Sequence, residues 1–197
     1  LELIHMASLV HDDVIDEALT RRGAATIQAK WDNRVAMYTG DYIFARSFEL
    51  ITEIKKPVLH QILAKTIVEV CLGEIEQIRD KYIFDQSVRT YFKRIKRKTA
   101  LLIATSCQLG AIAAGVEEHL HKKLFRFGYY VGMSYQVTDD ILDFVGTEKV
   151  LGKPAGGDLR QGNITLPVLF AMQDEQLKKQ IKGVHEGIEV EALQSII

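Results

Sequence analysis

The spacing of apolar residues is the feature that most constrains how this chain can fold. Apolar residues recur at intervals of three and four along most of its length, and only three prolines interrupt the pattern. Such intervals place side chains on one face of a helix, whereas a half-buried strand needs strict alternation. Because proline breaks helices, long segments without it can stay helical. The sequence therefore predicts an all-α fold.

Helices are expected at about residues 1–18, 25–38, 41–54, 57–81, 86–115, 118–146 and 164–180. Residues 146–162 are rich in glycine and polar side chains, and we expect a loop there. A chain of 197 residues with 47% hydrophobic content can bury one sizeable core, so residues 1–197 are interpreted as a single domain. The apolar pattern starts at the first residue without a preceding cap, which indicates that this domain is truncated at its N-terminus.

Charge and hydropathy narrow the range of partners. The formal net charge of -1 gives no overall positive field that would attract nucleic acid. No run of about 18 apolar residues occurs, so stable membrane insertion is not expected. Cys71 and Cys107 have no CxxC spacing, which favours buried thiols in a reducing compartment. We therefore predict a cytoplasmic protein.

Two copies of the pattern Asp-Asp-x-x-Asp are the strongest indication of chemistry. In a helix, the first and last aspartates of each copy lie on one face, where their like charges repel by roughly a few tenths of a kcal/mol. The cost is larger in apolar surroundings, and a bound divalent cation removes it. Mg²⁺ is typically held by a few carboxylates together with substrate phosphates. The predicted metal-binding residues are Asp12, Asp13, Asp16, Asp139, Asp140 and Asp143.

Spacing alone leaves other interpretations of the aspartates open. They could decorate a solvated helix face, or form a structural divalent-cation site in a noncatalytic helical subunit. A di-iron bundle would need paired Glu-x-x-His motifs, and Glu118-x-x-His121 is the one candidate in the sequence. Two copies of the motif on apolar helices favour the Mg²⁺ site over these alternatives.

Further segments of the chain add to the two aspartate clusters. In order, they are SLVHDDVIDEALTRRG, GDYIFARSFEL, GEIEQ, KTALLIATSCQLGA, YQVTDDILDF and GKPAGGDLRQGNITLPVL. With these motifs, the chain resembles the trans-type polyprenyl diphosphate synthases over nearly its whole length. The resemblance implies a bundle of long helices around a deep central cavity, with the two clusters facing each other at its mouth. It also implies a prenyltransferase that elongates an allylic diphosphate, such as farnesyl diphosphate, with isopentenyl diphosphate.

In the implied reaction, three Mg²⁺ ions hold the diphosphate of the allylic substrate. The diphosphate departs, isopentenyl diphosphate attacks the allylic cation in a head-to-tail 1'-4 condensation, and loss of a proton completes the step. By resemblance, the direct metal ligands are Asp12, Asp16 and Asp139. The supporting positions are Asp13, Asp140, Asp143 and Asp158.

Basic residues complete the diphosphate site that the resemblance implies. Arg21 corresponds to a contact with the allylic diphosphate and Arg22 to one with isopentenyl diphosphate, and guanidinium groups match phosphate oxygens well. The pair could also lie on the surface at a helix end. Lys98 and Lys153 correspond to a clamp on the allylic diphosphate. The basic residues just before Lys98 are interpreted as a solvated helix face: Lys93, Arg94 and Lys96.

Thr99 and Gln136 correspond to polar residues beside the developing carbocation, although both could be ordinary intrahelical polar residues. Asn163 stands where many relatives have a diphosphate-binding lysine, and the family's upstream Gly-Lys-x-x-Arg segment is not in this chain. The isolated polypeptide is therefore expected to be inactive or impaired. In having Asn163 and the segment GKPAGGD before it, the chain resembles the catalytic subunit of those family members that consist of two subunits. A homodimer and a heterodimer with a small regulatory subunit are both compatible with this.

Two small residues before the first cluster bear on product length. In the family, side chains four and five residues before this cluster form a floor under the growing product, and here they are Ser8 and Ala7. By the resemblance, small side chains there imply a medium or long all-trans product of about six to eight isoprene units. They could equally serve close helix packing.

The nearest chemical alternative is a class I terpene cyclase, which also carries a DDxxD cluster. Such cyclases usually have an Asn/Asp-x-x-Ser/Thr-x-x-x-Glu second motif, whereas residues 139–143 here read DDILD. A regulatory subunit that keeps only the fold would be expected to have lost aspartates, and all six are present. The sequence therefore favours the synthase.

Overall fold

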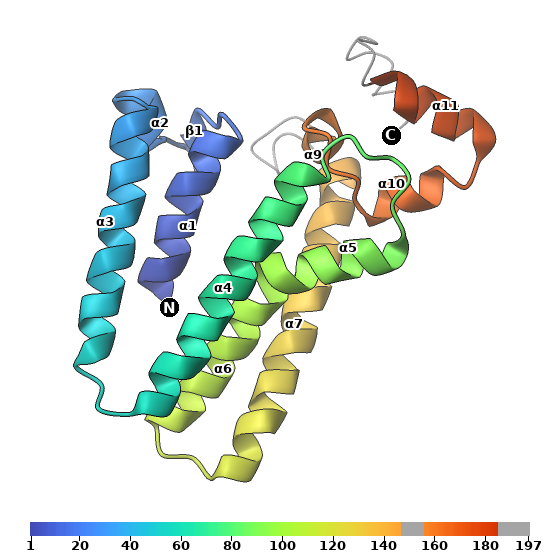
Figure 1. Ribbon diagram of the computed structural model, residues 1–197. Helices are drawn as coiled ribbons and strands as arrows, with labels where there is room; N and C mark the ends of the chain where they lie inside the picture. The colour runs from blue at the N-terminus through green and yellow to red at the C-terminus, as the bar shows by residue number, and fades with distance from the viewer. Residues whose placement is uncertain (147–155, 185–197) are drawn as a thin grey trace. The chain divides into compact units, whose positions relative to one another are not determined.

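The computed structural model describes residues 1–146 and 156–184 of the chain (Figure 1). Within this part, helices dominate, and the only strands are β1 (Thr20–Arg21) and β2 (Ala24–Ala25), which pair antiparallel. The prediction of an all-α fold is confirmed. The chain divides into two compact units, Leu1–His60 and Gln61–Ile197, which are described separately below. A single domain over residues 1–197 stays a prediction. None of the described helices is long and apolar enough to cross a membrane.

In the first unit, α1 (Glu2–Ile15) packs against α3 (Asn33–Thr52). Buried Ile4, Ala7 and Val10 form the inner face of α1. Gly40 on α3 lets the two helices approach closely, because a Cβ atom there would lie 2.3 Å from the Nε2 atom of His11. A larger residue at this position would therefore have to displace the ring of His11.

This contact explains why one predicted boundary is wrong. A break was expected between residues 38 and 41, where Gly40 looks like a helix breaker, but α3 runs through it. The chain instead breaks between the short α2 (Ile27–Lys30) and α3. Asp32 makes this break, since its Oδ1 atom accepts a hydrogen bond of 2.7 Å from the backbone N–H of Val35 and so caps α3.

The β1–β2 hairpin was not predicted. It turns at Arg22 and Gly23, which have φ angles of 51° and 77°. Two consecutive left-handed residues are typical of a tight hairpin whose twist matches that of its strands. The hairpin folds the chain back after the first aspartate cluster, and thereby sets where Arg21 lies.

In the second unit, α4 (Pro57–Arg79), which starts just before the boundary, runs beside α6 (Leu101–Ala113), and α6 packs against α7 (Glu118–Val145) (Figure 1). A five-residue π-helical turn, η1 (Lys96–Ala100), joins α5 (Val88–Ile95) to α6. The expected helix over 86–115 is therefore nearly right, apart from this turn. Single π turns of this kind often occur at functional sites.

Two glycines bring α7 close to the α5–η1–α6 segment. A Cβ atom on Gly132 would lie 2.5 Å from the Cα atom of Ala100, and one on Gly128 would lie 2.8 Å from the Cα atom of Ala104. The backbones themselves therefore touch along this contact, as small residues at helix interfaces permit.

The end of the chain differs from the expected single helix over 164–180. It forms α10 (Leu166–Ala171) and α11 (Glu175–Val184), and the side chain of Asp174 caps α11 by accepting the N–H groups of Gln176 and Leu177. The expected loop over 146–162 contains the short α9 (Gly157–Arg160). A buried core joins these helices to α5, and its residues are Tyr91, Ile95, Leu159, Ile164, Val168, Leu169 and Ile181.

The two cysteines are free but not buried, contrary to expectation. Cys71 is exposed on α4, and Cys107 is half-buried on α6. Cys71 follows the apolar spacing of its helix, yet it lies on an exposed face of α4.

Candidate functional site

The first aspartate cluster lies at the end of α1. Asp12 and Asp16 are half-buried, and Asp13 is buried. The Nε atom of Arg21 donates a 2.6 Å hydrogen bond to the Oδ1 atom of Asp13, because the β1–β2 hairpin returns Arg21 to the helix end. Asp13 is therefore bound to a guanidinium group rather than open to a metal on that oxygen. The middle aspartate of this cluster orients Arg21.

The other predicted site residues of the first unit differ in burial. Arg22 is exposed at the tip of the hairpin. Ala7 has no exposed surface, whereas Ser8 is half-buried and donates a 2.8 Å hydrogen bond to the carbonyl oxygen of His5. Both residues lie about one helical turn before Asp12, as the sequence predicts, and their role in product length stays a prediction.

The second cluster lies near the end of α7, and its three aspartates differ in burial. Asp139 is exposed, whereas Asp140 and Asp143 are each only 2% exposed. The Oδ2 atom of Asp143 accepts the backbone N–H of Asp158 at 3.1 Å, and its carbonyl oxygen accepts the N–H of Gly156 at 2.7 Å. Asp143 therefore anchors the start of α9, which brings Asp158 beside the cluster.

Asp140 is held by two side-chain donors. The hydroxyl group of Tyr91 donates to its Oδ2 atom at 2.7 Å, and the Nε2 atom of Gln136 donates to its Oδ1 atom at 2.8 Å. Burial raises the pKa of Asp140, and the hydrogen bonds from Gln136 and Tyr91 act in the opposite direction. A buried carboxylate needs such partners to stay charged.

Thr99 and Gln136, which the sequence singled out together, are in contact. The hydroxyl group of Thr99 donates to the Oε1 atom of Gln136 at 2.5 Å, from η1 to α7. The separation of 37 positions in the sequence makes this a tertiary contact. Thr99 and Gln136 thus contact each other across two helical segments, and Gln136 also donates to Asp140 within α7; their role beside a carbocation stays a prediction.

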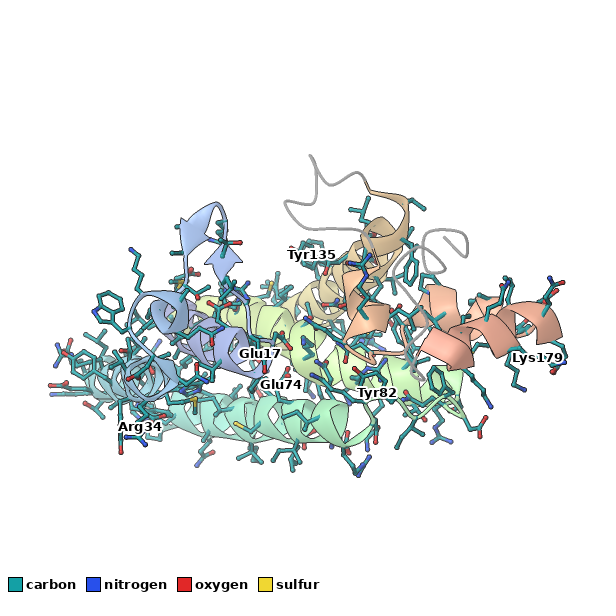
Figure 2. The ribbon with its side chains drawn as sticks, turned by 90° about the horizontal axis from the view of Figure 1, so that it is seen from above. Glu17, Arg34, Glu74, Tyr82, Tyr135 and Lys179 are labelled. Carbon is teal, nitrogen blue, oxygen red and sulfur yellow. The ribbon has the colours of Figure 1, made fainter. Side chains whose placement is uncertain are left out.

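Lys98 lies against the GEIEQ segment of α4. Its Nζ atom donates to the Oε1 atom of Gln77 at 3.1 Å and lies 3.8 Å from the Oε2 atom of Glu74, which is labelled in Figure 2. The amine of Lys98 is thus held at a definite place in the second unit. Lys153, its expected companion, lies outside the described residues.

Ion pairs fix the basic run that precedes Lys98. Arg97 contacts Glu69 at 2.9 Å and Glu76 at 2.6 Å, and Lys93 contacts Glu76 at 2.8 Å. The hydrogen bond from Arg97, followed by that from Lys93, lowers the pKa of Glu76. The run joins α4 to α5 and η1 through these pairs.

The interpretation of Arg94 as part of a solvated face is wrong. Arg94 is 6% exposed, donates to the Oε1 atom of Gln86 at 3.0 Å and to the carbonyl oxygen of Ile164, and lies 5.8 Å from the ring centre of Tyr91. Tyr91, which the sequence analysis missed, has no exposed surface. The spacing of Tyr91, Arg94 and Ile95 on one face of α5 was the signal that could have identified both.

The donor chemistry of the clusters suits a hard cation. Within the described ranges, no group of three or more His, Cys, Asp or Glu side chains is gathered closely enough to hold a metal ion unaided. Mg²⁺ does not need such a cage, because it keeps several waters and is usually bound by one or two carboxylates together with substrate phosphates. Exposed Asp139 and half-buried Asp12 and Asp16 can supply oxygen ligands of this kind.

Comparison with known proteins defines the class to which this fold and these residues belong. The model of the polyprenyl synthetase family matches residues 1–196. The chain belongs to the polyprenyl synthetase family. The resemblance drawn from the motifs is confirmed.

Individual members of the family are similar to this chain over nearly its whole length. The chain is 66% identical over 197 residues to heptaprenyl diphosphate synthase component 2 of Bacillus subtilis, covering 100% of this chain and 57% of that protein. It is also 66% identical to the protein of that name from Geobacillus stearothermophilus, with 62% of that protein covered. The crystal structure of heptaprenyl diphosphate synthase from Staphylococcus aureus matches with a TM-score of 0.94 and 44% identity, over 99% of this chain and 62% of that one. The chain thus spans about three fifths of the length of these relatives.

Proposed function

We propose that the protein containing this chain is a polyprenyl diphosphate synthase, a prenyltransferase that elongates an allylic diphosphate with isopentenyl diphosphate. The observation that carries the proposal is the arrangement on α7, where exposed Asp139 lies one turn beyond Gln136 and Gln136 contacts Thr99. The carboxylate of Asp139, which we propose binds metal, thus lies beside the neutral oxygen dipoles of Gln136 and Thr99. Ionisation of an allylic diphosphate needs both, because it separates a diphosphate anion from a carbocation.

The charged residues would act on the diphosphate end of the substrate. Bound Mg²⁺, in the proposal three ions, would neutralise the departing diphosphate. Asp12, Asp16 and Asp139 would hold the metal through carboxylate oxygens. Arg21, oriented by Asp13, would contact the allylic diphosphate through its other guanidinium donors, because the hydrogen bond to Asp13 uses its Nε atom.

Other cations would complete the diphosphate grip. Arg22 would bind isopentenyl diphosphate, and its exposed position at a hairpin tip leaves it accessible. Lys98 and Lys153 would clamp the allylic diphosphate. The amine of Lys98 contacts both Gln77 and Glu74, so it is already oriented before any substrate binds.

Thr99 and Gln136 would stabilise the allylic cation through their oxygen atoms. A preorganised dipole stabilises a developing charge more than water does, because it need not reorient during the reaction. The aspartates at supporting positions would act through their neighbours: Asp13 on Arg21, Asp140 on Gln136, and Asp143 on the segment that carries Asp158.

The length of the product and the subunit composition of the enzyme are also proposals. Two relatives are named heptaprenyl diphosphate synthase component 2, and the word component implies a second subunit in those proteins. We propose the same kind of assembly here, a heterodimer with a small regulatory subunit, with a homodimer as the alternative. The small pair Ala7 and Ser8 favours a long all-trans product. A cytoplasmic location stays a prediction.

An elongation assay tests the proposal. The full-length polypeptide is incubated with farnesyl diphosphate, labelled isopentenyl diphosphate and Mg²⁺, with and without the small subunit, and products are separated by chain length. We expect a medium- or long-chain polyprenyl diphosphate that is lost in Asp139→Asn and retained in Asp85→Asn. Asp85 is a suitable control because its side chain is 88% exposed and pairs only loosely with Lys182 at 3.9 Å. Absence of elongated product from the wild type, even with the second subunit, would refute the proposal.

A further inference from the structure

Four side chains from three helical segments of the second unit form one continuous hydrogen-bonded series. Tyr91 on α5 donates to Asp140 on α7, Gln136 on α7 donates to Asp140, and Thr99 on η1 donates to Gln136. The distances are 2.7, 2.8 and 2.5 Å. The series runs from the buried core of the unit to the pair proposed to face the carbocation.

The chemistry of the groups fixes the direction of every hydrogen bond. An ionised carboxylate only accepts, so both partners of Asp140 must present hydrogen atoms to it. The NH₂ end of the Gln136 amide therefore points to Asp140, and its oxygen points the other way, toward Thr99. Because that oxygen only accepts, the Thr99 hydroxyl must donate to it. The orientation of an amide and of a hydroxyl thus depends on one carboxylate.

The surroundings of Asp140 favour this anchoring role over direct metal binding. The residue is 2% exposed, whereas its neighbour Asp139 is exposed. Each of its oxygen atoms already accepts a side-chain hydrogen bond. Asp140 is thus held from both sides by side chains of the protein.

We propose that Tyr91 and Asp140 are positioning residues that hold the amide of Gln136 and the hydroxyl of Thr99 with their oxygen dipoles set for the allylic cation. The inference rests on the proposed function and deepens it. Tyr91 is the member of the series farthest from Thr99. Its ring is enclosed in the core with Ile95 and Val168, so its hydroxyl group stays in one position. Without that hydroxyl, Asp140 can turn, and Gln136 can present its NH₂ end to the cation.

Tyr91→Phe in the full-length polypeptide, with its second subunit if one is needed, tests the role directly. The substitution keeps the buried ring and removes only the hydroxyl. We expect kcat to fall about ten- to a hundredfold, which is less than the roughly hundred- to thousandfold loss on removing an oriented dipole outright, because Tyr91 acts through Asp140 and Gln136. KM for both diphosphates and the Mg²⁺ concentration for half-maximal activity should stay within about twofold of the wild type. Tyr82→Phe, which removes a hydroxyl that donates to the carbonyl oxygen of Arg160 at 3.1 Å, is the matched control and should leave kcat unchanged.

A double-mutant cycle separates positioning from a general effect on stability. If Tyr91 acts through Gln136, then Tyr91→Phe should lower kcat in the wild type but hardly at all in a Gln136→Ala background. A purely structural role would lower kcat by the same factor in both backgrounds, and this additive result would overturn the inference. Melting temperatures of all variants are measured alongside.

Asp140→Asn provides a test that does not depend on Tyr91→Phe folding. An asparagine offers Gln136 either an oxygen or an NH₂ group, so it no longer fixes which end of the Gln136 amide faces Thr99. We therefore expect kcat to fall as it does in Tyr91→Phe, and the Mg²⁺ requirement to stay unchanged, in contrast to Asp139→Asn. A rise of tenfold or more in the Mg²⁺ requirement would make Asp140 a metal ligand and overturn the inference. A wild type without elongation activity would instead refute the proposed function itself, so the two failures are distinguishable.

Discussion

Gly132→Ala is expected to damage activity far more than stability. Gly132 lies one helical turn before Gln136 on α7 and touches the backbone of Ala100, next to Thr99. The added Cβ atom would lie 2.5 Å from the Cα atom of Ala100 and 3.1 Å from its Cβ atom. Carbon atoms without a bond between them prefer about 3.5–4.0 Å. The two backbones must therefore separate by about 1 Å, and no side-chain rotation can relieve the overlap, because a backbone atom is the nearest contact.

The effect on stability combines two opposing contributions. Overpacking of a well-packed interface costs about 1–3 kcal/mol. Alanine favours the helical state over glycine by about 1 kcal/mol, which offsets part of this cost. We expect a net loss of about 0–2 kcal/mol, or a decrease in melting temperature of up to about 8 °C for a chain of this size. The folded protein should persist at 25 °C.

The effect on activity follows from the same shift. A separation of about 1 Å beside Thr99 pulls its hydroxyl away from Gln136, and displacements of this size can lower a rate by about a hundredfold. The assay compares kcat for isopentenyl diphosphate incorporation with the melting temperature. Gly110→Ala is the matched control, because Gly110 is an exposed position on α6 with nothing within 4 Å of the added atom. It should raise stability by up to about 1 kcal/mol and leave kcat unchanged. If Gly132→Ala behaved like this control, the reasoning from backbone contact would be wrong.

Three further predictions concern other parts of the molecule. Glu76→Gln should cost about 0.5–1 kcal/mol of unfolding free energy at pH 7 and less at pH 3 in urea titrations. The reason is that hydrogen bonds from Arg97 and Lys93 lower the pKa of Glu76, so its contribution is present above its unfolded pKa and lost as pH falls; an equal loss at both pH values would contradict this. Ala7→Phe should shorten the polyprenyl product seen by chromatography, and an unchanged length in a folded variant would exclude the floor role. Asp139→Asn should raise the Mg²⁺ concentration for half-maximal activity at least about tenfold, and an unchanged requirement would exclude Asp139 as a ligand.

Local patterns in the sequence were sufficient for the helical class of this chain. The spacing of apolar residues is a property of neighbouring positions, and it placed α1, α4 and α7 within a few residues of their observed bounds. Capping signals were also local: Asp32 and Asp174 each start a helix through a side-chain oxygen. Both were missed because the apolar pattern continues across them.

Glycine marks the limit of local reasoning. Gly40 falls between the expected helices over 25–38 and 41–54, yet it lies inside α3, where it makes room for His11. Gly128 and Gly132 do the same for α6 and η1 against α7. A glycine that ends a helix and one that admits a neighbouring helix look alike in a sequence, because the neighbour that decides between them is distant along the chain.

The candidate site shows the same division. From the sequence alone came the two aspartate clusters, Arg21, and the pairing of Thr99 with Gln136 as chemically related positions. Tertiary structure alone distinguished the members of each cluster: it buried Asp13 beside Arg21 and Asp140 beside Tyr91, and left Asp139 exposed. The physical reason is that a residue's type and spacing determine which atoms it can offer, whereas its burial and hydrogen-bond partners come from segments far away in the chain, which only the packed fold brings together.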